Sequence, residues 1–220
     1  TCLYICYWIT RLVMDKFNPH KDKIAVVVKS FKLKRKSEFF LDRFSEPYIV
    51  SMAIDEQGAY DTSIDFNILP FPNVRKNETV SFDGQGHLIY GPNNPGQFLA
   101  YSILFIESDK DVRDFGKIME NILKSEAVNL GAKALLKAAP TYSTAINLLQ
   151  NLTDLIAKQL QKNKDDELFR RNGTLLRDVK PPYDILRSYD SENDFIKTKT
   201  SIIPLNVSNK MGKQTKAIKL

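Results

Sequence analysis

The residues best suited to chemistry in this chain are a cluster of basic side chains near its N-terminus. The cluster consists of Lys29, Lys32, Lys34, Arg35 and Lys36. The segment 24–34 reads IAVVVKSFKLK, in which β-branched residues give way to an alternation of lysine with apolar residues. This alternation predicts a strand with Lys32 and Lys34 on one face. Such a basic face attracts acidic membrane headgroups. The alternative is a solvated sheet face whose lysines discourage pairing at a strand edge.

Enzymatic chemistry has little support in the sequence. The only two histidines, His20 and His87, have neither a metal-ligand nor a catalytic-triad spacing. The chain contains no glycine-rich phosphate loop, no GxSxG nucleophile elbow and no HExxH helix. Both cysteines, Cys2 and Cys6, lie at the very start, so neither a disulfide framework nor a cysteine nucleophile is expected in the body of the protein. We therefore expect a non-enzymatic protein, with a carboxylate-based hydrolase as the least favoured alternative.

Length and composition limit the remaining classes. The chain has 220 residues, of which 43% are hydrophobic and 26% charged, with a formal net charge of +6. These values are typical of one globular domain and exclude wholesale disorder. Arginine and aromatic residues are not interleaved along any one predicted element, so nucleic acid is not expected as a partner. The partners that remain are an anionic membrane surface, a protein partner or a second copy of the chain.

The hydrophobic pattern predicts strands, then helices, then strands again. Period-two patterns and turn residues place strands at 24–34, 47–55, 63–69, 78–82, 87–90, 97–107, 173–178, 183–189 and 194–205. Helical spacing predicts helices at 109–123, 126–139 and 143–162. Strands divided by one helical block are typical of a single antiparallel sandwich. We expect an α+β, mainly β fold: an antiparallel, roughly eight-stranded sandwich with an α-helical hairpin inserted at about 109–163.

Both ends of the chain are expected to lie outside this fold. Residues 1–13 read TCLYICYWITRLV and are followed directly by Met14 and a polar stretch. The segment is interpreted either as upstream sequence translated ahead of a start at Met14 or as a shortened signal-peptide core. In both interpretations it contributes nothing to the fold. The single domain then spans 14–220, with a flexible basic tail at about 206–220 that carries four lysines.

Two short motifs resemble a known family. Residues 45–50, Ser-Glu-Pro-Tyr-Ile-Val, open a predicted strand and are similar to the Ser-Asp-Pro-Tyr-Val signature of C2 domains, the calcium- and phospholipid-binding sandwiches. Residues 107–109, Glu-Ser-Asp, and 114–116, Asp-Phe-Gly, follow about 60 residues later and resemble the acidic loop of the same family. The likeness covers roughly residues 23–116, with glutamate at two positions where the family usually has aspartate. The resemblance implies a divergent C2-like sandwich that carries a helical insertion.

The resemblance also implies a calcium site. It brings to one end of the sandwich six carboxylates, Asp42, Glu46, Glu107, Asp109, Asp111 and Asp114. Calcium takes six to eight oxygen ligands, so this set is suited to it. The alternative is that Asp109 and Asp111 occupy the first turn of a helix, where the helix dipole stabilises carboxylates without any metal. Calcium is the one cofactor that the sequence suggests, and the alternative needs none.

An apolar stripe on the last predicted helix adds a candidate interaction surface. Leu149, Leu152 and Ile156 recur at helical spacing among further apolar residues. This surplus predicts a contact with another chain, and the alternative is packing on the protein's own sheet.

These features favour a binding module that docks to an anionic membrane surface or to a protein partner, with calcium involved or not. The main alternative is a structural or assembly subunit whose helical insertion makes the subunit contacts. We favour a cytoplasmic protein, with a membrane-peripheral location as the alternative.

Overall fold

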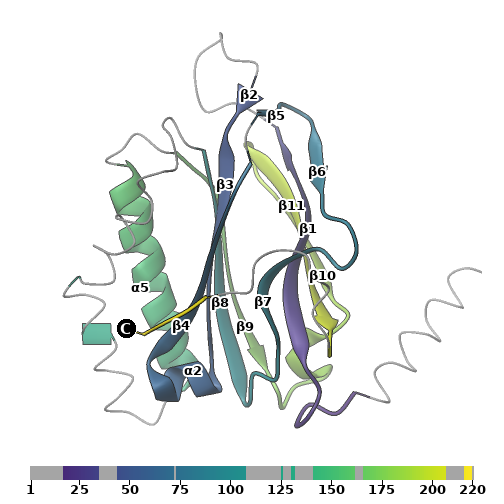
Figure 1. The fold of residues 1–220 in the computed structure, drawn as a ribbon, viewed down its shortest axis with the longest axis vertical. Helices are drawn as coiled ribbons and strands as arrows, with labels where there is room; N and C mark the ends of the chain where they lie inside the picture. The colour runs from purple at the N-terminus through teal and green to yellow at the C-terminus, as the bar shows by residue number, and fades with distance from the viewer. Residues whose placement is uncertain are drawn as a thin grey trace, which may run out of the picture.

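The computed structural model describes residues 17–34, 44–71, 73–107, 125, 130–131, 141–161, 166–206 and 216–219. In these residues the chain builds three layers: a helix, a central sheet and an outer sheet (Figure 1). The central sheet contains β3 (Pro47–Asp55), β4 (Ser63–Pro70), β8 (Phe98–Glu107), β9 (Asp166–Leu176) and β12 (Lys216–Lys219). The outer sheet contains β1 (Ile24–Leu33), β6 (Thr79–Ser81), β7 (His87–Asn93), β10 (Ser188–Glu192) and β11 (Ile196–Pro204). The helix layer is α5 (Tyr142–Gln161).

Smaller elements connect these layers. The strands β2 (Phe44–Ser45) and β5 (Val74–Arg75) pair with each other at one end of the sandwich. The short helix α2 (Glu56–Asp61) follows β3, and the 3₁₀ helix η2 (Pro182–Asp184) lies between β9 and β10. No helix in the described part of the chain is both long enough and apolar enough to cross a membrane.

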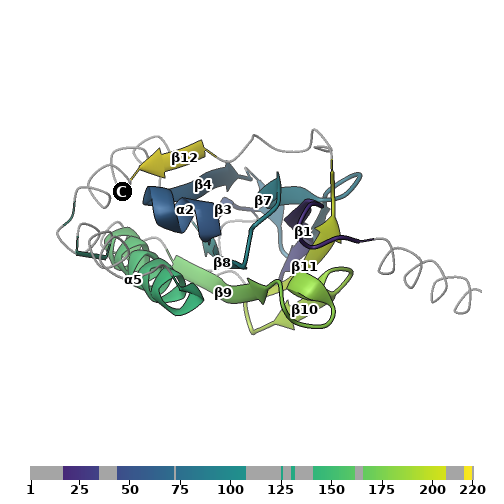
Figure 2. The ribbon, with the colours of Figure 1, turned by 90° about the horizontal axis from the view of Figure 1, so that it is seen from below.

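The strand order brings together segments that are far apart in the sequence. The central sheet runs β12-β4-β3-β8-β9, and the outer sheet runs β10-β11-β1-β6, with β7 also paired to β1 (Figure 2). All pairings between the described strands are antiparallel. β1 and β11, from opposite ends of the described chain, are therefore neighbours in the interior of the outer sheet.

The two middle strands of the central sheet are buried on both faces. Every residue of β3 and of β8 is buried. Because side chains alternate along a strand, Leu104 and Ile106 of β8 pack toward α5, whereas Ile103 and Phe105 pack toward the outer sheet. These strands read as nearly continuous hydrophobic runs because neither face meets water.

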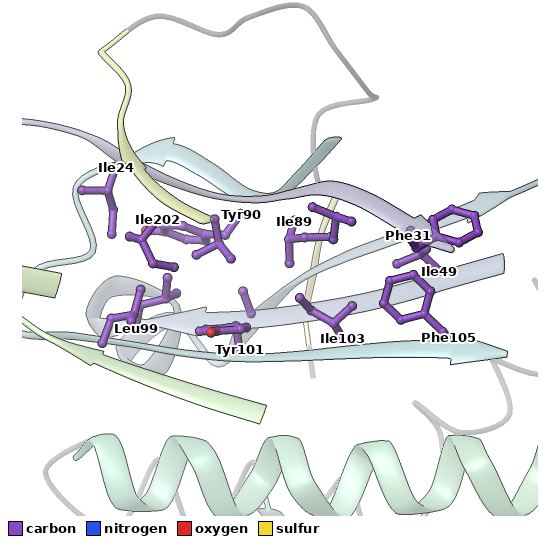
Figure 3. Close-up of a cluster of buried hydrophobic side chains, with 14 of the residues drawn as sticks. Ile24, Phe31, Ile49, Ile89, Tyr90, Leu99, Tyr101, Ile103, Phe105 and Ile202 are labelled. Carbon is purple, nitrogen blue, oxygen red and sulfur yellow. The ribbon is translucent and has the colours of Figure 1, made fainter. Parts of the chain in front are cut away.

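The core between the sheets is apolar and partly aromatic. Ile24, Phe31, Ile89, Tyr90 and Ile202 of the outer sheet meet Ile49, Leu99, Tyr101, Ile103 and Phe105 of the central sheet (Figure 3). The rings of Phe31 and Phe105 make an edge contact with centroids 5.6 Å apart. Edge-on pairs of this kind stabilise a core beyond their burial alone.

The sequence prediction of two antiparallel layers of strands in a mainly β protein is confirmed. The helix predicted at 143–162 is found as α5. The strand count differs: in the residues that the structure describes, the two sheets contain five strands each, rather than eight in all. The two earlier predicted helices lie largely outside the described residues, of which Leu130 and Gly131 are helical.

Two predictions in the C-terminal third are wrong. A strand was expected only from Gly173, but β9 starts seven residues earlier, at Asp166. The segment 183–189, predicted as one strand, instead contains η2 and the start of β10. The first half of β9 is rich in charged residues and so lacks an alternating pattern, yet its backbone pairs with β8 along its whole length.

Two further elements, α2 and β12, are not among the predicted ones. Residues Glu56–Asp61, in the connection between the predicted strands 47–55 and 63–69, form the helix α2, whose first turn is capped by the Asp55 carboxylate accepting a 2.7 Å hydrogen bond from Gly58 N. Four residues of the predicted flexible tail, Lys216–Lys219, pair with β4 as the edge strand β12. These residues extend the central sheet by one strand at its β4 edge.

Candidate functional site

Five lysines lie on the two neighbouring interior strands of the outer sheet. Three come from β1 or its end and two from β11, and we name this set the lysine face: Lys29, Lys32, Lys34, Lys197 and Lys199. On β1, Phe31 and Leu33 point into the core, so the alternate side chains between and after them point outward. On β11 the same alternation exposes both lysines, while Ile196, Thr198 and Thr200 between and beside them are buried.

Strand register brings lysines of the two strands together. Lys32 pairs directly with Lys197, and Ser30 pairs with Lys199. The register shifts between Val28 and Ser30, which leaves Lys29 as an extra residue on β1. Cross-strand partners of this kind have Cβ atoms only about 5 Å apart.

The neighbouring strands extend these pairs into two rows on the outer surface. One row reads Thr79, Lys32, Lys197, Glu192, and the other reads Ser81, Ser30, Lys199, Asp190. Between the rows lies a shallow hollow of about 360 Å³, whose polar lining consists of Ser30, Lys32, Thr79, Asp190, Lys197, Thr198 and Lys199. Ammonium groups and hydroxyls around one depression can hold an anionic oxygen such as that of a phosphate or carboxylate.

The charges on this face are only partly compensated. The Glu192 carboxylate accepts a 2.7 Å hydrogen bond from Lys34 Nζ and lies 3.6 Å from Lys197 Nζ. The hydrogen bond from Lys34 holds the pKa of Glu192 below its ordinary value. Among the described residues, Lys32 and Lys199 form no ion pair.

The pKa of Lys29 is also perturbed. Partial burial lowers it, and the nearby positive charge of Lys199 lowers it further. A like-charged neighbour disfavours the protonated form of an ammonium group. The lysine face is therefore a place where positive charges already repel one another.

The sequence analysis identified three of the five lysines of this face, Lys29, Lys32 and Lys34. Lys32 and Lys34 share a face, as the alternation predicts. Arg35 and Lys36 lie outside the described residues. Sequence reasoning missed Lys197 and Lys199, although the segment 196–200 shows the same alternation of lysine with inward-facing residues. Their relevance depends on the pairing of β11 with β1, which the sequence pattern does not specify.

The predicted calcium ligands are mostly outside the described residues. This applies to Asp42, Asp109, Asp111 and Asp114. Glu46 is exposed and precedes Pro47, which pairs with the buried Glu107, so these two carboxylates lie at the same end of the central sheet. In the part of the chain that the structure describes, no three acidic, histidine or cysteine side chains form a group suited to a metal ion. The calcium site stays a prediction.

The predicted interaction stripe lies in the core. Leu149, Leu152 and Ile156 are at most 1% exposed and pack with Val50 and Leu104 of the central sheet. The expectation that these three side chains contact another chain is therefore wrong. The apolar outward face of β3 and β8 requires a cover, and the stripe of α5 provides it.

A buried polar cluster elsewhere is structural in character. Tyr90 donates a 2.7 Å hydrogen bond to Asp55, which also accepts one from Asn93 at 3.1 Å. Burial, followed by the Asp55 charge, raises the pKa of the Tyr90 phenol, which stays protonated and able to donate. These bonds tie β7 of the outer sheet to the end of β3 in the central sheet.

The lysine face is thus the described feature with the clearest binding chemistry. Comparison of the chain with protein-family models, with curated proteins and with solved structures finds no match.

Proposed function

We propose that this protein is a non-enzymatic binding module that docks on an anionic membrane surface through its lysine face. The observation that carries the proposal is the direct pairing of Lys32 with Lys197, beside Lys199 and around one hollow. Like charges placed opposite each other on paired strands destabilise a sheet. An external anion relieves that repulsion, and each basic residue near an anionic membrane contributes about 1 kcal/mol of attraction.

The alternative interpretation, that these lysines discourage pairing at a strand edge, does not explain their position. Lysines that prevent sheets from pairing edge to edge belong on edge strands. β1 has β11 on one side and β6 and β7 on the other, and β11 lies between β10 and β1. Neither strand presents a free edge, so edge protection gives no reason for a lysine cluster there. Attraction of an external anion does give a reason for the cluster.

The C2 resemblance and an accessory role for calcium belong to the same proposal. The antiparallel sandwich is compatible with the resemblance, and Glu46 and Glu107 lie at one end of the central sheet. We expect calorimetry with millimolar calcium to give measurable heat, and Asp109→Asn to weaken binding strongly because a hard-cation site loses one carboxylate charge. Absence of heat with the unmutated protein would reject the calcium part and leave lysine-mediated docking unaffected.

Docking is tested by sedimentation with vesicles of phosphatidylcholine, with and without phosphatidylserine. The variant Lys32→Glu/Lys199→Glu lowers the net charge from +6 to +2, since each reversal removes two charges. Losing two lysine contributions of about 1 kcal/mol each predicts at least about 30-fold weaker binding. Salt at about 0.5 M should also release the unmutated protein, because the Debye length falls well below 10 Å.

The matched control is Lys21→Glu/Lys158→Glu, which has the same net charge. Both lysines are exposed, and Lys158 lies on α5, in the layer opposite the outer sheet. Its binding should change much less than that of the lysine-face variant. Equal losses in the two variants would show a response to net charge alone. Salt-resistant binding, or no binding to phosphatidylserine vesicles, would refute the proposed function, and binding to an acidic protein instead would favour a protein partner.

A further inference from the structure

We propose that Glu192 acts as an intramolecular counter-anion: it pairs with Lys34 and Lys197 and so keeps these two lysines from binding an anionic surface. Lys32 and Lys199 then make the first contact with that surface. The inference rests on the proposed docking function and names the residue that limits its strength.

One carboxylate holds a lysine from each of the two strands. Glu192 is the last residue of β10, and in the sheet register it lies opposite Lys197. Its Oε1 is 2.7 Å from Lys34 Nζ, and its Oε2 is 3.6 Å from Lys197 Nζ. The Lys34 ammonium also donates a 2.9 Å hydrogen bond to the Asn193 carbonyl. Two of the five lysines are thereby directed toward β10.

The turn that carries Glu192 is fixed from several sides. The Asn193 side chain accepts hydrogen bonds from the backbone of Phe195 and Ile196, both at 2.9 Å, and donates one of 2.7 Å to Leu168 O in β9. Lys34 N donates a 2.6 Å hydrogen bond to Phe195 O. The carboxylate is therefore presented to both lysines by a pinned backbone, which reduces the entropy lost when the ion pairs form.

The ion pairs with Glu192 and the attraction of these lysines to an anionic membrane are similar in energy. The side chains of Lys34 and Glu192 are 34% and 46% exposed, so their pair is partly screened by water. Exposed ion pairs and the attraction of one lysine to an anionic membrane are of the same order of energy. The pairs with Glu192 therefore offset most of what the two lysines could contribute, and the carboxylate adds its own repulsion.

Lys32 and Lys199 have no such restraint in the described part of the chain. Lys199 pairs in register with Asp190, the other carboxylate on this surface of β10, but forms no ion pair with it. Lys32 lies between Thr79 and Lys197, neither of which is acidic. The geometry thus separates two restrained lysines beside Glu192, Lys34 and Lys197, from two unrestrained ones, Lys32 and Lys199.

The test uses the full chain with Glu192→Gln and Glu192→Ala. Both replace an exposed side chain, so the fold should be retained, and circular dichroism checks this. Asp178→Asn is the matched control, because it removes an exposed carboxylate that pairs with Arg177 away from the lysine face. Limited acetylation read by mass spectrometry reports lysine access without any membrane. Acetylation of Lys34 relative to Lys32 should rise at least about twofold in both Glu192 variants and stay unchanged in the control.

Vesicle binding then measures the consequence. Release of one to two lysines predicts about fivefold to 30-fold tighter binding of the Glu192 variants to phosphatidylserine vesicles, with the control within about twofold of the unmutated protein. Unchanged acetylation of Lys34 would overturn the inference whatever the vesicles show. Raised acetylation with unchanged vesicle affinity would overturn the inference but leave docking intact. No vesicle binding by any form would overturn the docking function and the inference with it.

Discussion

His87 shows how the fold controls the charge of a single residue. Its side chain is 3% exposed, its ring stacks near Phe82 with centroids 5.5 Å apart, and Nε2 lies 3.5 Å from Asn67 Nδ2. Burial lowers the pKa of His87 from 6.5 to about 4. The imidazole is consequently neutral in the folded protein at pH values where the unfolded chain already binds a proton.

This difference predicts a loss of stability in mild acid. A group whose pKa is lower in the folded state makes unfolding take up a proton, here between pH 6.5 and about 4. The free energy of unfolding should therefore fall as pH falls through this window, by roughly 2 kcal/mol between pH 7.5 and 5. Denaturant titrations at the two pH values measure it. His87→Gln should remove most of the fall, whereas the exposed control His20→Gln should retain it, and equal falls in both would contradict the assignment.

The lysine face shows which functional residues can be predicted from the sequence and which cannot. The outward position of Lys32 and Lys34 follows from a period of two within one strand, which is local information. The pairing of Lys32 with Lys197 joins residues 165 positions apart, and no local pattern specifies it. His87 was recognised only as lacking a ligand spacing, because its burial depends on contacts with Phe82 and Asn67.

At the scale of elements, one buried hydrogen bond fixes α5 on the central sheet. Thr153 Oγ1 donates a 2.7 Å hydrogen bond to Leu149 O and lies 2.9 Å from Ser102 Oγ of β8. A hydroxyl has one proton, so Ser102 must be the donor to Thr153. Both side chains are fully buried, and the contact between helix and strand is therefore directional as well as apolar.

This arrangement predicts an unequal effect of removing the two hydroxyls. Thr153→Val leaves the Ser102 hydroxyl buried without an acceptor and should cost about 1–3 kcal/mol of unfolding free energy. Ser102→Ala leaves Thr153 still bonded to Leu149 O and should cost about 1 kcal/mol or less. The double variant should cost less than the sum, because no unpaired donor remains. Guanidinium titrations of the four proteins measure these differences, and strictly additive losses would contradict the donor assignment.

Elements were predictable where burial leaves a strong pattern. β8 is buried along its length and α5 has a continuous apolar stripe, so the predicted bounds lie within one residue of the observed ones. β9 lacked such a pattern, because its first half is rich in charged residues. Arg170 pairs with Glu167 at 2.8 Å, and Gly173 has the Tyr101 ring directly opposite it. The Tyr101 ring leaves no room for a Cβ atom at position 173, so the partner strand β8 explains why this position holds glycine.

At the scale of the whole molecule, the order of strands, helices and strands is sufficient to predict an antiparallel sandwich. It does not specify which strands are neighbours. β1 could have paired with the strand that follows it, yet its partners are β11, β6 and β7. The central position of β3 and β8 is likewise a consequence of tertiary burial, since a continuous hydrophobic run predicts burial on both faces without naming the layers that cover them.

The central sheet makes the two hydrophobic cores dependent on each other. Alternate side chains of β8 belong to different cores, with Leu104 packed under α5 and Ile103 packed against the outer sheet. Disrupting the packing of either α5 or the outer sheet therefore disturbs β8, against which the other layer also packs. We expect one cooperative unfolding transition rather than separate loss of the helix and the sheets.

Two truncations, one in each core, test this coupling. Leu152 of α5 is 1% exposed and Ile103 of β8 is fully buried, so Leu152→Ala and Ile103→Ala should each cost about 2–5 kcal/mol. In each variant the midpoint measured by far-ultraviolet circular dichroism should coincide with the midpoint measured by tyrosine fluorescence, and both should shift together from those of the unmutated protein. Asn151→Ala, at an exposed position beside Leu152, should leave both midpoints unchanged within about 0.5 kcal/mol. A Leu152→Ala protein whose helical signal is lost at lower denaturant than its tyrosine signal would show that the helix layer unfolds independently of the sandwich.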